Sequence, residues 1–200
     1  MCPASAYGEF LAALRDAGIA VTPADVAGSL VAQASGRSTP EAEARRVADH
    51  ARDLGRGAAP VVLGGHSRGG LVAYLAAAAV QPAALVLVDP VSGGGPPWAK
   101  PAPLPPVGWS GPALVLGCGR GGHCAPAGRN HEVFATALPA CAHTVVSDAG
   151  HADLLDGPVR TMGRLLCSRG SDPDRAREQL AEHVVVFLRS AGLRDLPPAQ

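Results

Sequence analysis

The segment Pro60 to Gly70, which reads PVVLGGHSRGG, decides the fold of this 200-residue chain. Its first half, Pro60 to Gly64, is predicted to be a short apolar strand, and the apolar segment Leu71 to Val80 is predicted to be a buried helix. Between them, Gly65-His66-Ser67-Arg68-Gly69 matches the G-x-S-x-G pattern, whose glycines permit a tight bend that lifts the serine above the sheet. A serine before a helix is also a common N-cap, so this second role of Ser67 stays open.

Strands and helices alternate on both sides of this turn. Further strands are predicted at 18–23, 83–88, 112–117 and 144–147, and further helices at 7–16, 39–54, 130–138 and 173–190. Continuous apolar strands separated by helices are typical of the α/β class, with a mostly parallel sheet covered by helices on both faces. With 47% hydrophobic residues, the chain suits a single domain over residues 1–200.

The segment 92–111 interrupts this alternation. It is rich in glycine and proline and contains Trp98 and Trp109, so we expect a long surface loop near the carboxyl edge of the sheet. A low-complexity insertion and a substrate-facing loop explain this composition about equally well.

The charge and apolar content exclude several classes of protein. Lys plus Arg and Asp plus Glu are 17 each, which argues against nucleic acid or an anionic membrane surface as the main partner. The longest apolar run, Leu71 to Val80, is shorter than the ~18 residues of a membrane span. The N-terminus has neither a secretory signal nor the Arg- and Ser-rich composition of a transit peptide.

The cysteines predict neither a disulfide framework nor a zinc site, because they are odd in number and lack paired spacings. They are Cys2, Cys118, Cys124, Cys141 and Cys167. His123-Cys124 is a candidate ligand pair, but no second pair lies at the spacing that zinc needs. We therefore expect no metal and no cofactor.

A serine hydroxyl needs a base to take its proton, and in a strand–turn–helix protein of this kind an acid and then a histidine follow the serine in the chain. His151 lies just after the predicted strand 144–147, where that base is expected. Histidines such as His66, in the turn itself, fit this place less well. Asp89 ends the strand that follows the serine turn, and we prefer it roughly threefold to Asp148 and Asp153 as the acid. A plain turn residue before Pro90 is the alternative for Asp89.

These placements predict an ester hydrolase. Ser67, Asp89 and His151 would each follow a different strand at the carboxyl edge, where open α/β sheets build their sites. Ser67 would attack the carbonyl, His151 would take its proton, and Asp89 would orient His151. The backbone N–H of Arg68, directly after the serine, is the expected oxyanion donor.

Four stretches of the chain resemble the chlorophyllase family of the α/β-hydrolase superfamily. They are Gly65-His66-Ser67-Arg68-Gly69-Gly70, Val88-Asp89-Pro90-Val91, Asn130-His131-Glu132-Val133-Phe134, and the histidine loop from Asp148 to Asp156. The resemblance runs from about Tyr7 to Leu188, and the family's triad falls on the three residues chosen above. It implies hydrolysis of chlorophyll to chlorophyllide and phytol, in chlorophyll catabolism in the chloroplast. Such an apolar substrate is compatible with peripheral membrane contact.

The start of the chain looks like the region just after the family's His-Gly loop. The resemblance therefore predicts an N-terminally truncated α/β-hydrolase-type fold without the earlier strands and without the second oxyanion donor, a loss worth about 2.7–4 kcal/mol. Two other hypotheses remain. The chain could be a carboxylesterase or lipase that acts on another apolar ester, or a catalytically weak remnant that binds tetrapyrrole or lipid.

Overall fold

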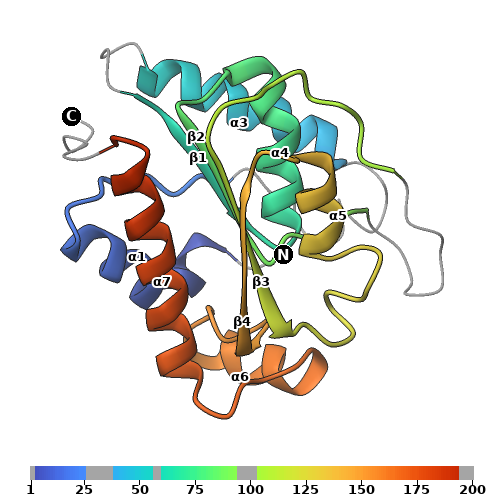
Figure 1. Ribbon diagram of the computed structural model, residues 1–200. Helices are drawn as coiled ribbons and strands as arrows, with labels where there is room; N and C mark the ends of the chain where they lie inside the picture. The colour runs from blue at the N-terminus through green and yellow to red at the C-terminus, as the bar shows by residue number, and fades with distance from the viewer. Residues whose placement is uncertain (1–2, 26–37, 56–59, 94–102, 194–200) are drawn as a thin grey trace.

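The sheet consists of four parallel strands in the order β1-β2-β3-β4, in a computed structural model that describes residues 3–25, 38–55, 60–93 and 103–193. The strands are β1 (Val62–His66), β2 (Ala84–Val88), β3 (Ala113–Arg120) and β4 (Ala142–Gly150). Because all strands run the same way, their carboxyl ends lie at one edge of the sheet (Figure 1). The α/β class predicted from the sequence is confirmed.

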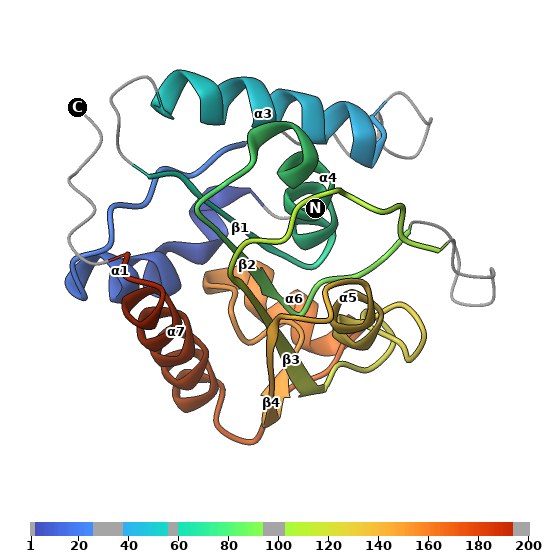
Figure 2. The same cartoon turned by 45° about the horizontal axis from the view of Figure 1, so that its top comes forward.

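Helices cover both faces of this sheet, as Figure 2 shows. On one face lie α1 (Gly8–Asp16) and α7 (Pro173–Ser190), and on the other lie α3 (Pro40–Gly55), α4 (Arg68–Val80) and α5 (His131–Ala137). The short 3-10 helix η1 (Ala4–Tyr7) precedes α1, and α6 (Gly157–Leu166) lies beyond the carboxyl ends of β3 and β4. The two faces enclose two separate apolar clusters.

Strand β2 shows how alternation divides these clusters. Val86 and Val88 pack with Leu180 and other residues of α1 and α7, whereas Leu85 and Leu87 face α4 and α5. Every residue of β2 is buried, as expected for a parallel strand covered on both sides. Both clusters thus pack against β2, the strand that ends directly before Asp89.

Most predicted elements exist, with shifted ends. Helix α7 has the predicted bounds, and Asn130 caps α5 by accepting a hydrogen bond from the Glu132 backbone N–H at 3.2 Å. Strand β1 begins two residues later than predicted and runs to His66, while β4 runs on to Gly150. His151 therefore follows its strand directly.

The strand predicted at 18–23 is wrong. Gly18, with φ of +85°, ends α1, and the chain after it has no regular secondary structure. Ile19 and Val21 pack against the cluster of α1 and α7. Their apolar character reflects this side-chain burial, which needs no backbone pairing.

The Gly- and Pro-rich segment is only partly described, because residues 94–102, with Trp98, lie outside the described ranges. Residues 103–111 have no regular secondary structure. Trp109 is buried and donates from Nε1 to the Pro82 carbonyl at 3.1 Å, and the Tyr74 hydroxyl of α4 donates to the Pro105 carbonyl at 2.8 Å. This half of the segment contributes to the core beside α4.

Among the described residues, no helix is long and apolar enough to cross a membrane.

Candidate active site

Ser67 lies in a strained turn between β1 and α4. Its backbone has φ of 57° and ψ of −126°, a region that residues with a side chain rarely occupy. The neighbouring strand holds the turn, because the Ser67 N–H donates to the Val88 carbonyl at 3.2 Å. Although Ser67 stands at the N-cap position of α4, its side chain makes no capping hydrogen bond. The hydroxyl is thus directed elsewhere.

The glycines around Ser67 differ in how much space they have. A Cβ on Gly65 would lie 2.2 Å from the Gly69 carbonyl oxygen, and one on Gly70 would lie 2.7 Å from Pro90 Cβ. A Cβ on Gly69 would meet nothing within 4 Å. Gly65 and Gly70 are therefore required by packing, and Gly69 is not.

The hydroxyl of Ser67 lies 2.9 Å from Nε2 of His151, and Nδ1 of His151 lies 2.7 Å from Oδ2 of Asp89. A carboxylate only accepts, so Nδ1–H donates to Asp89, and Nε2 is left to accept the serine proton. Asp89 is fully buried and His151 is 6% exposed. The second carboxylate oxygen of Asp89 accepts from the Cys118 backbone N–H at 3.0 Å. The three residues predicted from strand ends therefore lie in one hydrogen-bonded chain.

The two alternative acids hold the histidine loop in place. Asp153 accepts from the backbone N–H groups of Gly150 and Gly170, both at 2.7 Å. Asp148 is hydrogen-bonded to the Ser171 side chain and pairs with Arg120 at 2.7 Å. The Ser171 hydrogen bond and the Arg120 charge lower the pKa of Asp148. Neither carboxylate forms a hydrogen bond or ion pair with His151 in the described structure.

His66 is a second imidazole beside His151, with ring centroids 4.7 Å apart. Nδ1 of His66 is hydrogen-bonded to the Tyr7 hydroxyl at 2.9 Å. Burial, and then the nearby charge of His151, lowers the pKa of His66 to about 3. His66 is therefore neutral at physiological pH. The sequence pattern predicts no role for the contact between His66 and Tyr7, because it joins residues 59 positions apart in the chain.

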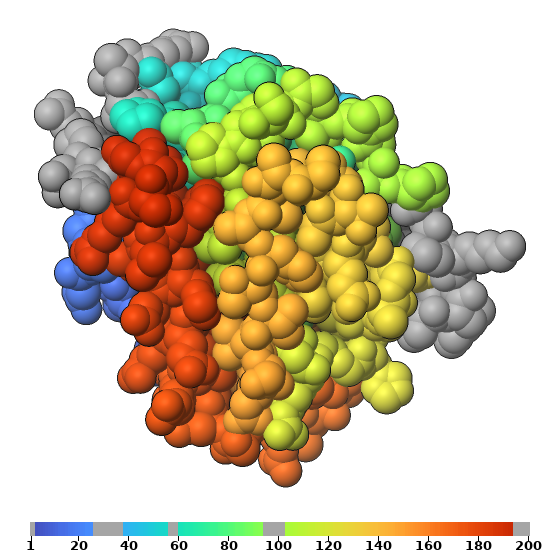
Figure 3. Space-filling view, viewed as in Figure 1, coloured from blue at the N-terminus to red at the C-terminus, as the bar shows by residue number. Residues whose placement is uncertain are grey.

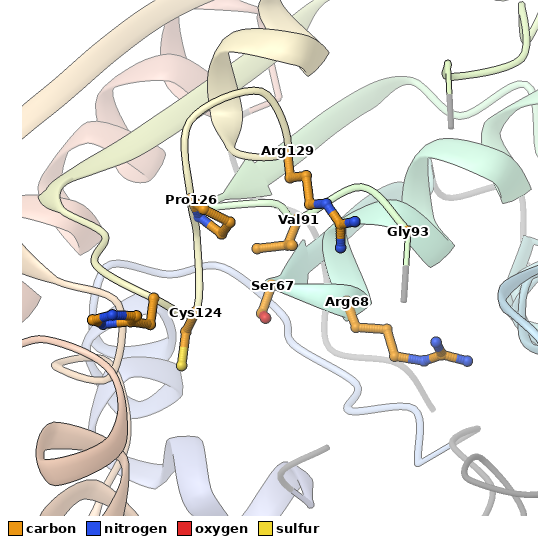
Figure 4. A pocket seen from close by; sticks show the side chains of 8 residues that line it. Ser67, Arg68, Val91, Gly93, Cys124, Pro126 and Arg129 are labelled. Carbon is orange, nitrogen blue, oxygen red and sulfur yellow. The ribbon is translucent and has the colours of Figure 1, made fainter. Parts of the chain in front are cut away.

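The side chain of Arg68 points away from Ser67 (Figure 4) and binds α3. Its Nε donates to Glu43 Oε2 at 3.1 Å and its Nη2 donates to Glu43 Oε1 at 3.1 Å. Glu43 is fully buried and also accepts from the Ser38 hydroxyl at 2.6 Å. This pair fixes the first turn of α4, which carries the Arg68 backbone N–H predicted as oxyanion donor.

A pocket of about 220 Å³ opens at Ser67. Its lining, shown in Figure 4, includes Ser67, Arg68, Val91, Cys124, Pro126 and Arg129. One wall is the Ser67 turn and another is the loop between β3 and α5, while Val91 and Gly93, which follow β2, complete the lining. The Arg129 side chain gives this small space a polar character near the serine hydroxyl.

The expectation that no disulfide forms is wrong, because Cys124 is bonded to Cys167 across 43 residues. The bond joins the pocket loop to the end of α6, two segments whose cysteines share no motif spacing. His123-Cys124 is accordingly no ligand pair. Within the described ranges, no group of three or more His, Cys, Asp or Glu residues could hold a metal ion.

Comparison with known proteins adds the family context. The chlorophyllase family model matches residues 53–195. Two proteins named "Chlorophyllase-1, chloroplastic", from Citrus unshiu and Citrus sinensis, are each 33% identical over 150 residues, covering 64% of this chain and 44% of the relative. "Chlorophyllase-2" of Arabidopsis thaliana is 31% identical over 156 residues, covering 64% and 48%. The chain thus spans about half the length of the curated relatives it matches. No solved structure matches it significantly.

Proposed function

The chain belongs to the chlorophyllase family, and we propose that it hydrolyses the phytyl ester of chlorophyll with Ser67, His151 and Asp89 as its triad. The observation that carries the proposal is the hydrogen-bonded chain from the Ser67 hydroxyl through His151 to the buried Asp89, with distances of 2.9 and 2.7 Å. Serine, histidine and a buried acid in this order form the machinery of serine esterases on unrelated folds.

In the first half of the reaction, Ser67 Oγ attacks the ester carbonyl while Nε2 of His151 takes the hydroxyl proton. The Nδ1–H group is held by Asp89, which fixes the tautomer and stabilises the imidazolium. His151 then gives its proton to the alkoxy oxygen, so the C–O bond breaks and phytol leaves. Chlorophyllide remains bonded to Ser67 as an acyl ester.

In the second half, water replaces phytol. His151 takes a proton from water, the hydroxide adds to the acyl carbonyl, and the proton passes to Ser67 Oγ as the acid leaves. The oxyanion formed in each half accepts from the Arg68 backbone N–H at the start of α4. The buried Glu43 pair supports this role, because it anchors the turn that carries the donor.

Chlorophyll as substrate and the chloroplast as location are proposed from the names of the relatives. If the same three residues cleaved an ester of another apolar alcohol and not chlorophyll, the proposed substrate would change and the proposed triad would stand.

The proposal is tested by incubating the purified chain with chlorophyll and measuring chlorophyllide. Ser67→Ala should lower turnover by at least about 10⁴-fold, because the nucleophile is gone. Ser110→Ala, which removes an exposed hydroxyl, should match the wild type. Chlorophyllide production that survives Ser67→Ala would exclude Ser67 as the nucleophile. Binding without turnover by the wild type would indicate a tetrapyrrole-binding remnant.

The acid is tested by comparing two aspartates. Asp89→Asn should lower kcat about 10⁴-fold, because the amide cannot stabilise the imidazolium. Asp148→Asn should lower kcat far less, since that carboxylate contacts Ser171 and Arg120. The reverse order would move the acid to the histidine loop.

A further inference from the structure

Arg129 is a buried cation in the wall of the pocket at Ser67. It is only 6% exposed, although it belongs to a loop in which Gly122 and Gly128 are exposed. Figure 3 shows the yellow atoms of this loop and of α5 on the surface of the molecule. In Figure 4 the Arg129 side chain extends from the loop to a position beside Val91, which also lines the pocket. A guanidinium with five N–H donors therefore lies in the wall of the site.

Backbone hydrogen bonds fix the position of Arg129. Its N–H donates to the Pro126 carbonyl at 3.0 Å, and this bond closes a turn in which Gly128 has φ of +79°, a conformation that favours glycine. Its carbonyl accepts from the Ser92 N–H at 2.7 Å, which joins the loop to the segment after β2. The next residue, Asn130, caps α5. The side chain thus starts from a backbone that is held on both sides, as a specific binding contact requires.

The charges in the pocket favour a ligand that carries an oxygen acceptor. Among the described residues that line the pocket, none is acidic. The second arginine of the lining, Arg68, is paired with the buried Glu43. A hydrocarbon group offers no acceptor, and burying a charged group against hydrocarbon alone is unfavourable. Because a guanidinium has five donors, Arg129 can hold its protein neighbours and still donate to an oxygen of the ligand.

The size of the pocket limits which part of an ester it can take. Its volume of about 220 Å³ lies below the roughly 300–1,000 Å³ of sites that enclose a whole ligand. The pocket therefore accepts one group of a larger substrate, next to the carbonyl that Ser67 would attack. An apolar alcohol has no acceptor beyond the ester bond, whereas the acid part of an ester can carry a second carbonyl group.

We propose that this pocket binds the acid part of the ester, and that Arg129 donates a hydrogen bond to a second carbonyl oxygen there. The enzyme then selects esters of oxo acids over esters of plain alkanoic acids, and the apolar alcohol lies outside this pocket. The inference rests on the proposed function, because it takes Ser67 as the nucleophile. Arg129 is a specificity-determining residue in this account and takes no part in proton transfer.

The specificity is tested with p-nitrophenyl esters of pentanoic, 4-oxopentanoic, hexanoic and 5-oxohexanoic acid. Each rate is divided by the rate of hydrolysis by hydroxide, which corrects for the intrinsic reactivity of the ester. For the wild type, kcat/KM should be at least about tenfold higher for one oxo ester than for the alkanoate of the same length, because the charged donor gains an acceptor.

Variants at Arg129 assign this preference to the guanidinium. Arg129→Leu should lower kcat/KM for the preferred oxo ester at least about tenfold more than kcat/KM for the matching alkanoate. Arg129→Lys should retain part of the preference, because lysine is still a cationic donor but lacks the planar fork. The matched control Arg175→Leu removes an exposed arginine of α7 and should retain the full preference.

The proposal is overturned if the wild type prefers neither oxo ester, a result that needs no variant to fold. It is also overturned if the preference survives in Arg129→Leu that is folded by circular dichroism, or if this variant loses oxo and alkanoate hydrolysis equally. Ser67→Ala should abolish hydrolysis of all four esters, and hydrolysis that survives it would contradict the proposed triad. Equal hydrolysis of all four esters by the wild type, lost in Ser67→Ala, would contradict the role of Arg129 alone.

Discussion

The two walls of the pocket at Ser67 are held in different ways. The turn wall, Gly65 to Gly70, is fixed by close packing of backbone on backbone and by the buried pair between Arg68 and Glu43. The loop wall, from Gly121 to Arg129, is fixed by few internal hydrogen bonds and by the bond from Cys124 to Cys167. The turn wall depends on glycines that leave room for neighbouring backbone atoms, whereas the loop wall depends on a disulfide bond to the end of α6.

This difference separates two ways of placing groups around Ser67, the proposed nucleophile. The turn wall needs a narrow set of residues, because its backbone has an unfavourable φ at Ser67 that only tight surroundings maintain. The loop wall tolerates a longer and less regular path, because one bond fixes its position. Mutations should therefore affect the two walls to different extents.

The largest effect is expected for Gly65→Ala. The added Cβ would lie 2.2 Å from the Gly69 carbonyl oxygen and 2.7 Å from the Gly70 nitrogen, and backbone atoms cannot move aside easily. Gly65→Ala should lower the free energy of unfolding by at least about 4 kcal/mol, which is among the largest losses caused by point mutations, and should also abolish hydrolysis. Urea denaturation measures the free energy of unfolding.

Gly69→Ala is the matched control for this change, since its Cβ meets nothing within 4 Å. It should change stability by less than about 1 kcal/mol, because alanine is the better helix former. Equal effects of the two substitutions would refute the packing account of the turn wall.

Breaking the loop wall should have an intermediate effect. C124S/C167S removes the bond without leaving a lone thiol, and should lower the free energy of unfolding by about 2–4 kcal/mol. The rate of hydrolysis should fall as well, because Cys124 lines the pocket. Cys141→Ser, which changes a free cysteine, should leave hydrolysis unaltered. An unchanged denaturation curve for the double variant would show that this bond does not hold the wall.

Glu43→Gln should have the smallest effect of the three. It should lower the free energy of unfolding by about 2 kcal/mol at neutral pH, because the charged partner of Arg68 becomes neutral. Burial raises the pKa of Glu43, but the hydrogen bonds from Arg68 and Ser38 and the arginine charges outweigh it and lower the pKa below its ordinary 4.5. A lowered folded pKa stabilises the fold above pH 4.5, and this contribution is lost as the pH falls below that value.

The stability gap between wild type and Glu43→Gln should therefore narrow in acid, as measured by urea denaturation across the pH range. Glu41→Gln, at an exposed position of the same helix, should show no such gap. A gap that is independent of pH would mean that the charge of Glu43 does not support the turn.

The contrast between the turn wall and the loop wall also explains which features the sequence could predict. Strand, turn and helix around Ser67 follow from local patterns, and the strand ends then locate Asp89 and His151. Glu43 and the disulfide depend on segments brought together by the fold, across 25 and 43 positions. Helix α6 escaped prediction because its short sequence contains Gly157, Pro158 and Gly163, residue types that usually indicate a loop. The family resemblance, read from four short stretches, is confirmed over most of the chain.

The neighbouring rings of His66 and His151 have a consequence for the charge at the site. Because burial and the nearby charge of His151 lower the pKa of His66 to about 3, this imidazole is uncharged at neutral pH. No second positive charge therefore opposes the imidazolium that would form on His151 when it takes the serine proton.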